Sequence, residues 1–194
     1  MRMRVMLWKR MAWMLAVVAL CAPGPALAGE LEGVEMPEVA MVQGRPMLLN
    51  GMGLRDVFIV DVYVAGLYLP TRSSDAEALL AADEPWRVVL HFLRDVDGED
   101  ICEAWMDGLD ANTPDASEDL RRRFDILCDW MPDVAEGQEL EFVYMPGAGT
   151  TVTASGAVQG TMQGLDFAHA LMACWIGPKP GPGEDFKNGV LGLD

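Results

Sequence analysis

Histidine is almost absent from this 194-residue sequence, which contains only His91 and His169. Neither has the spacing to the other histidine, or to a pair of cysteines, that zinc and iron sites require. The sequence contains no G-x-S-x-G nucleophile elbow, and no cysteine lies in a context typical of a catalytic nucleophile. The G-x-G at residues 51–53 does not complete a dinucleotide-binding fingerprint. We therefore expect no metal, no cofactor and no hydrolase of a familiar type.

Positive charge is also scarce, with 14 Lys and Arg against 30 Asp and Glu. Four of the cations and none of the acids lie in residues 1–28, so residues 29–194 carry a net charge of −20. Such a surface repels the phosphates of nucleic acids and anionic lipid headgroups. Nucleic-acid binding is therefore excluded as a main role.

The N-terminus has the pattern of a secretory signal peptide. A basic segment precedes an apolar run, residues 11–21, that is too short to span a membrane. Ala26-Leu27-Ala28 then gives the small-x-small pattern of a cleavage site. We expect residues 1–28 to be removed and the protein to be periplasmic or otherwise exported; an uncleaved membrane anchor is the alternative. No later stretch could span a bilayer, so we expect no stable membrane insertion after cleavage.

Three cysteines follow the expected cleavage site: Cys102, Cys128 and Cys174. An exported protein can keep disulfides, and a bond between Cys102 and Cys128 would join two neighbouring predicted helices. The interpretation we favour is that all three are buried small hydrophobic residues on the core faces of helices. Because their number is odd, at least one thiol stays free.

The residues after the signal peptide are expected to form one domain, preceded by a short leader. Residues 29–38 are acidic and are expected to be an irregular, flexible leader, so the domain covers residues 39–194. Strands and helices are grouped rather than strictly alternating, which predicts the α+β class, with an antiparallel sheet covered by helices on one face. Strands are expected at residues 39–42, 46–50, 57–69, 86–93, 139–145, 150–153 and 157–162, and helices near residues 74–82, 97–109, 114–131, 166–175 and 186–193.

The sequence is organised around residues 50–70. Val57–Leu69 is the longest β-prone run, rich in valine, isoleucine, phenylalanine and tyrosine, and its one charged residue is Asp61. Gly51-Met52-Gly53 is expected to form a flexible corner that leads into this run. Arg55 is the only cation of the segment and lies just before the strand. An arginine beside a buried strand, with two tyrosines downstream, is suited to holding a carboxylate or an enolate.

Six segments stand out when they are taken in order: GMGLR, VYVAGLYLP, HFLRDV, YMPGAGTTV, DFAHALMACWIG and NGVLG. Together they resemble those of the bacterial chalcone-isomerase-like proteins. The resemblance implies an open-faced β-sandwich: a large antiparallel sheet, a layer of helices against it and a cleft between them. In that superfamily, plant enzymes cyclise chalcones to flavanones, and related non-catalytic members bind fatty acids through an arginine and a tyrosine on the sheet. The resemblance covers about residues 34–192.

The resemblance also implies site residues, position by position. Arg55, in GLR, matches the arginine of the family's GVR motif. Tyr63 falls where the catalytic enzymes carry a threonine and the fatty-acid binders a tyrosine, and Asn112 loosely matches an active-site asparagine. Tyr68 matches a structural tyrosine, and the serine or threonine of the enzymes falls near Ala173, where the hydroxyl is missing. The implied ligand-binding residues are Arg55, Tyr63 and Asn112, with Arg55 the catalytic residue if the protein is an enzyme.

One geometric condition applies to this pair of residues. Arg55 and Tyr63 are eight residues apart, which is about 26 Å in a straight strand. The chain must therefore bend or fold back near Asp56 if the two share a site. The alternative role for Arg55 is a structural salt bridge or the pinning of a loop.

Three functions are consistent with these residues. The first is a non-catalytic exported protein that binds a small amphipathic carboxylic acid, such as a fatty acid, or a phenolic ligand in the cleft. The second is an isomerase of the chalcone-isomerase type, an intramolecular lyase in which Arg55 stabilises an enolate or phenolate. The third is an envelope scaffold without a ligand. Tyr63 in place of threonine, and the missing hydroxyl near Ala173, favour the first. The oligomeric state is not predicted.

Overall fold

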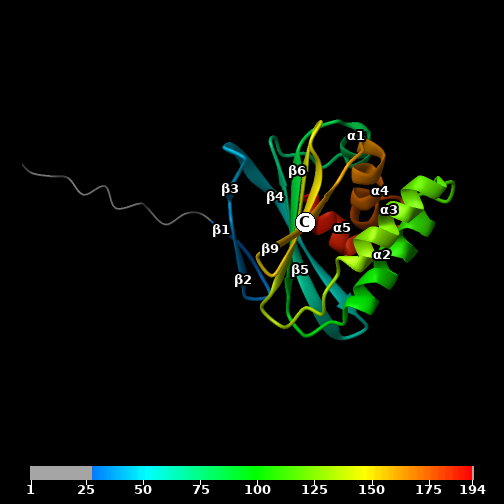
Figure 1. Ribbon diagram of the computed structural model, residues 1–194. Helices are drawn as coiled ribbons and strands as arrows, with labels where there is room; N and C mark the ends of the chain where they lie inside the picture. The colour runs from blue at the N-terminus through cyan, green and yellow to red at the C-terminus, as the bar shows by residue number, and fades with distance from the viewer. Residues whose placement is uncertain (1–27, 194) are drawn as a thin grey trace, which may run out of the picture.

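The computed structural model describes residues 28–193 of the chain (Figure 1). Apart from Ala28, the predicted signal peptide lies outside these residues. Within the described range, no helix is long and apolar enough to cross a membrane.

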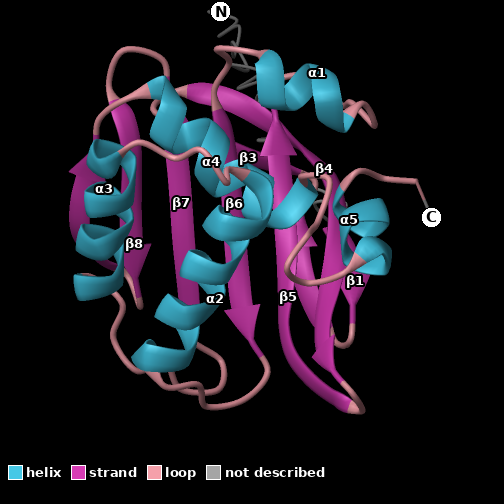
Figure 2. Cartoon of the chain, turned by 90° about the vertical axis from the view of Figure 1, so that its right-hand side faces the viewer, coloured by secondary structure: helices cyan, strands magenta, loops and turns pink. Residues whose placement is uncertain are grey.

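A seven-stranded antiparallel sheet forms the centre of the molecule, and the helices cover one of its faces (Figures 1 and 2). The strands of the sheet follow one another in sequence order, from β3 to β9. This is the predicted α+β architecture, an open-faced sandwich. The strands are β1 (Ala28–Leu31), β2 (Val34–Pro37), β3 (Val39–Val42), β4 (Arg45–Val57), β5 (Val60–Leu69), β6 (Trp86–Phe92), β7 (Glu139–Met145), β8 (Gly149–Ala154) and β9 (Ala157–Met162). The helices are α1 (Ala76–Ala81), α2 (Gly98–Asn112), α3 (Glu118–Asp129), α4 (Leu165–Ile176) and α5 (Glu184–Val190).

Alternation along the strands sorts the side chains of the sheet into two apolar layers. On β6, Val88 and Leu90 belong to the core between the sheet and the helices, and Val89 belongs to a smaller cluster on the outer face. Helix α4 is buried along most of its length, because the sheet lies on one side of it and α1, α2 and α3 pack against it. The layer between the sheet and α4 is therefore the main core.

Residues 28–37 form a β-hairpin, so the prediction of an irregular leader over residues 29–38 is wrong. Its turn, Glu32-Gly33, adopts φ angles of 48° and 74°. Val34 and Met36 are buried in the cluster on the outer face of the sheet. Apolar and acidic residues alternate here, which gives the hairpin one apolar face and one solvated face. The high content of acids concealed this alternation.

The apolar run Val57–Leu69 is two strands rather than one, because the chain reverses at Phe58-Ile59. Strand β4 ends at Val57 and β5 begins at Val60, and the two pair in an antiparallel manner. Phe58 adopts a φ of 60°, in the left-handed region. Glycine, asparagine and aspartate are the usual residues of such tight hairpin turns. This turn was not predicted, because Phe58 and Ile59 are residues typical of strands rather than of turns.

The predicted flexible corner at residues 51–53 is also wrong, because these residues continue β4. Gly51 is required by the close approach of helix α5. A Cβ atom at this position would lie 2.1 Å from the carbonyl oxygen of Gly189. The glycine therefore permits the packing of a helix against the strand.

A disulfide between Cys102 and Cys128 joins α2 to α3, with the two Cα atoms 4.8 Å apart. The favoured interpretation, in which all three cysteines are unlinked core residues, is therefore wrong for this pair. The two helices pack side by side, which brings the thiols within bonding distance. Cys174 is free and 2% exposed, and burial raises its pKa to about 12.

Candidate functional site

Arg55 and Tyr63 lie opposite one another in the β4–β5 hairpin. The reversal at Phe58-Ile59 closes the gap that a straight strand would leave, so the chain does fold back, two residues beyond Asp56. Tyr63 packs against the helix-side core, and cross-strand partners project from the same face of a sheet. The pair therefore faces the helices.

The Arg55 guanidinium holds the connector between α4 and α5, which we define as residues 177–183. Its Nη1 donates a hydrogen bond of 2.7 Å to the carbonyl oxygen of Gly181. The Gly181 amide donates in turn to the carbonyl of Cys174 at 2.9 Å. Three prolines in this heptapeptide have no N–H to donate, so side chains provide much of its anchoring. In this structure Arg55 thus has the loop-pinning role that was the alternative for it.

The Tyr63 ring lies between two phenylalanines in the layer between the sheet and the helices. Its centroid is 5.6 Å from that of Phe92 and 6.0 Å from that of Phe186. Burial raises the pKa of Tyr63 above its ordinary value of 10.0, while Arg55 and the indole N–H of Trp175 act in the opposite direction. The phenol is therefore neutral at pH 7 and can donate a hydrogen bond next to a guanidinium.

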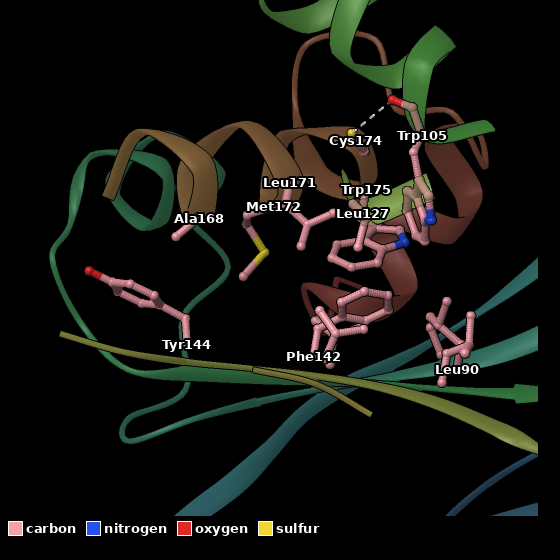
Figure 3. Close-up of a cluster of buried hydrophobic side chains, with 14 of the residues drawn as sticks. Leu90, Trp105, Leu127, Phe142, Tyr144, Ala168, Leu171, Met172, Cys174 and Trp175 are labelled. Carbon is pink, nitrogen blue, oxygen red and sulfur yellow. Dashed lines mark hydrogen bonds between the residues drawn. The ribbon is translucent and has the colours of Figure 1, made fainter. Parts of the chain in front are cut away.

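Two tryptophan N–H groups in this layer lack a hydrogen-bond partner. Trp105 on α2 and Trp175 on α4 are 5% and 2% exposed, and their rings meet edge to face with centroids 5.2 Å apart. Neither Nε1 atom has an acceptor at hydrogen-bonding geometry among residues 28–193, although the Trp175 N–H lies close enough to the Tyr63 phenol to lower its pKa. Figure 3 shows both indole nitrogens on the same side of the cluster, away from Tyr144. Because an unsatisfied buried N–H costs about 1–3 kcal/mol, an acceptor that entered here would be stabilised.

Asn112, the last residue of α2, holds the connector from the helix side. Its Nδ2 donates to the carbonyls of Lys179, at 2.9 Å, and Gly108, at 3.0 Å. Its Oδ1 accepts a hydrogen bond of 2.9 Å from the Lys179 amide. The side chain thus makes its polar contacts with backbone, and together with Arg55 it fixes carbonyls two residues apart in the connector.

The space between the sheet and the helices is almost filled. The cavity there has a volume of about 10 Å³, which is room for about one water molecule. The expectation of an open cleft is therefore wrong for this structure, because large apolar side chains occupy it. A ligand can enter only if the helices or the connector move. The cavity is lined by Ala65, Leu67, Val88, Met172, Trp175, Ile176, Phe186 and Val190.

A larger hollow, of about 270 Å³, lies at the other end of β4. Arg45 and Met47 contribute to its lining from β4, together with Met145 and the loops around Pro70 and Pro85. Arg45 begins β4 and Arg55 follows ten residues later, about 33 Å along the strand. This hollow is therefore separate from the pair of Arg55 and Tyr63.

The two other residues that the resemblance singles out, Tyr68 and Ala173, lie in packed apolar parts of the structure. Tyr68 is buried in the outer-face cluster, and the Arg87 guanidinium lies 4.9 Å from its ring centroid, in agreement with the structural role predicted for it. Ala173, on α4, is 8% exposed and provides no hydroxyl. Sequence reasoning missed the N–H groups of Trp105 and Trp175, since helical spacing predicts burial but not whether a polar atom has a partner.

The sequence matches the family model of the chalcone isomerase-like proteins over residues 28–192. Among solved structures, its fold is similar to that of a fatty-acid binding protein of Arabidopsis thaliana, with a TM-score of 0.67 and 14% sequence identity. The similarity covers 85% of this chain and 96% of the Arabidopsis chain. No curated protein matches the sequence. The resemblance to chalcone-isomerase-like proteins inferred from the six segments is thereby confirmed, and the chain belongs to the chalcone isomerase-like family.

Proposed function

We propose that this protein is a non-catalytic binder of a small amphipathic carboxylic acid, such as a fatty acid, held between the sheet and the helices. The observation that carries the proposal is the pairing of Arg55 with Tyr63 on the helix-facing side of the hairpin, next to the N–H of Trp175, which has no acceptor at hydrogen-bonding geometry among the described residues. One cation and two neutral donors suit the two oxygens of a carboxylate.

The hydrocarbon part of the ligand occupies the small cavity once it is enlarged. Met172, Phe186 and Val190 surround this space and offer only apolar surface. Each Å² of apolar area removed from water contributes about 25 cal/mol. The polar end at Arg55 and the apolar walls together select an amphipathic molecule rather than a fully polar acid.

In this proposal, Arg55 exchanges the Gly181 carbonyl for the ligand when the ligand enters. The bond from Arg55 to a neutral carbonyl gives way to a bond to an anion, which is roughly twice as strong. Release of Gly181 loosens the connector and with it α5, whose Phe186 lines the cavity. Opening and binding are therefore coupled through one side chain.

The Arabidopsis protein of similar fold supports this proposal, since its name states that it binds fatty acids. Because the identity is 14%, this similarity indicates the fold and not the ligand, and the ligand class rests on Arg55, Tyr63 and Trp175.

Export of the protein is supported by the disulfide between Cys102 and Cys128. Disulfides persist in oxidising compartments such as the periplasm and are rare in the cytosol. Together with the signal-peptide pattern of residues 1–28, this bond favours a function outside the cytoplasm.

A second function, that of a scaffold without a ligand, is favoured by the filled interior. A cavity of about 10 Å³ holds no organic acid unless the structure opens. The two functions differ in whether the closed structure is the only one that the protein adopts.

Native mass spectrometry with added lauric and palmitic acids separates these functions. A binder gives a one-to-one complex that Arg55→Ala and Tyr63→Phe weaken. Arg122→Ala is the matched control, because Arg122 lies on the surface of α3 with a side chain 66% exposed, and it leaves binding unchanged. A wild-type protein that stays free of acid under gentle ionisation supports the scaffold instead. A chalcone cyclisation rate above that of buffer would assign the isomerase function.

A further inference from the structure

The tip of the β4–β5 hairpin carries four consecutive apolar residues, Val57 to Val60, which we call the apolar tip. Phe58 and Ile59 are each 95% exposed, and Val57 and Val60 are 41% and 38% exposed. The other exposed large hydrophobic residues of the described chain are Val39, Met41, Val158 and Leu193, and no two of these are consecutive. The hairpin projects at one end of the sheet, below β5 in Figure 2. Scattered exposed apolar residues are normal, whereas a contiguous group indicates an interaction surface.

Folding alone does not account for the residues at this turn. Phe58 adopts a φ of 60°, a conformation that is unfavourable for a bulky side chain and that glycine or asparagine adopts readily. At 95% exposure, neither Phe58 nor Ile59 contributes to the core. The turn thus combines an unfavourable backbone conformation with two large side chains in water.

The apolar tip lies next to the proposed acid-binding pair. In the hairpin register, Val57 pairs with Val60, Asp56 with Asp61, and Arg55 with Tyr63. Two register steps therefore separate the tip from the pair of Arg55 and Tyr63, which is about 7 Å. Whatever binds the tip lies next to the end of the hairpin that holds Arg55.

Charge and shape select among the surfaces that the tip could meet. Asp56 and Asp61 flank it, and residues 29–194 carry a net charge of −20, so an anionic surface repels this end of the molecule. The tip is a protrusion rather than a groove, and a lipid layer accepts protruding apolar side chains of any shape. Phenylalanine and isoleucine are suited to the boundary between headgroups and acyl chains.

We propose that the apolar tip inserts into the surface of a zwitterionic lipid layer and holds the pair of Arg55 and Tyr63 at the depth of the lipid carboxyl and ester groups. The proposed function explains why the tip lies beside this pair, since amphipathic acids partition into such layers. Two side chains give weak, reversible attachment, as a single myristoyl chain does. The chain therefore docks on the layer without spanning it.

The test is flotation of the purified protein with phosphatidylcholine vesicles. The wild-type protein is expected to float with the vesicles, and the double variant Phe58→Ser, Ile59→Ser to lose at least tenfold in partition coefficient. Val158→Ser is the matched control, because Val158 is a 67% exposed apolar residue on β9, and it retains wild-type binding. Phosphatidylglycerol vesicles bind less protein at low salt, and added salt restores part of the binding. All variants are prepared with the same N-terminus, so any contribution of residues 1–28 cancels.

Three outcomes overturn the proposal: wild-type protein that does not float, a double variant that floats as well as the wild type, and a Val158→Ser variant that loses binding equally. Self-association that the double variant abolishes, with no flotation, assigns the tip to a second copy of the chain. Unchanged melting temperatures show that both variants fold. Acid binding in solution, measured without vesicles, tests the proposed function separately from this docking.

Discussion

Arg55 and Tyr63, eight residues apart in the sequence, lie directly opposite one another across the β4–β5 hairpin. The Arg55 guanidinium also donates a hydrogen bond of 2.7 Å to the carbonyl of Gly181 in the connector. One side chain therefore belongs both to the proposed carboxylate site and to the contacts that hold α5 in place. If an acid takes the place of the Gly181 carbonyl, as proposed, the connector loses an anchor and binding is coupled to opening.

Replacement of Arg55 by glutamine is expected to loosen the connector in the absence of ligand. The Gly181 amide should exchange its hydrogen faster, and the free energy of unfolding should fall by about 1 kcal/mol, the usual worth of a hydrogen bond. Hydrogen exchange read by mass spectrometry checks this. Arg122→Gln, on the surface of α3, is the control and should leave exchange of residues 177–183 unchanged. Equal exchange rates in the wild type and in Arg55→Gln would contradict the role of Arg55 as an anchor of the connector.

Replacement of Asn112 by alanine is expected to be more destabilising, because it removes three hydrogen bonds to Gly108 and Lys179. The loss should be about 2–3 kcal/mol, at roughly 1 kcal/mol for each bond. Urea unfolding measures it as a lower midpoint at constant slope. In Gln159→Ala the amide lost is exposed and bonds only to Ala157, so that variant should stay within about 0.5 kcal/mol of wild type. A similar midpoint for both variants would contradict the assigned role of Asn112.

Loss of the disulfide between Cys102 and Cys128 is expected to cost about 3 kcal/mol, because the bond closes a loop across a separation of 26 residues. The double variant Cys102→Ser, Cys128→Ser should melt at a lower temperature than the oxidised wild type. Dithiothreitol should lower the melting temperature of the wild type and leave that of the double variant unchanged. A wild-type melting temperature that does not respond to reduction would argue against the bond in solution.

Much of the fold could be predicted because burial patterns repeat along the chain. The apolar run at residues 86–93 predicts β6 to within one residue, and the grouping of strands and helices predicts an antiparallel sheet covered on one face. The pairing of Arg55 with Tyr63 could not be predicted in the same way. It depends on a reversal at Phe58-Ile59, where the sequence carries none of the usual turn residues.

The state of the interior also could not be predicted from the sequence. Helical spacing places Trp105 and Trp175 in the core, but whether their N–H groups find acceptors depends on packing between elements far apart in the chain. The resemblance implied a cleft, whereas Phe186 and Trp175 fill the space. The hairpin at residues 28–37 is different, because its signal was present: apolar residues alternate around a Glu32-Gly33 turn.

Alkaline pH is expected to destabilise the protein through Cys174. Burial raises the pKa of this thiol from 9.0 to about 12, so the unfolded chain loses its proton at a lower pH than the folded chain does. The contribution of the thiol to stability is therefore full below pH 9, falls by about 1.4 kcal/mol per pH unit above it, and is lost as the pH passes 12. Cys174→Ala should lose less stability than the wild type between pH 9 and pH 12. Parallel pH profiles of urea midpoints would contradict this.

The central claim is that the acid binds beside Trp175, and the indole N–H signals of the protein in a ¹H–¹⁵N NMR spectrum test it most directly. On titration with laurate, the Trp175 signal is expected to shift downfield as its N–H gains a carboxylate acceptor. The Trp130 signal serves as the internal control, because its ring packs against Gly160 on β9. Arg55→Ala should abolish the shift. Saturable laurate binding that leaves Trp175 unchanged, or an equal shift in Arg55→Ala, would contradict the account.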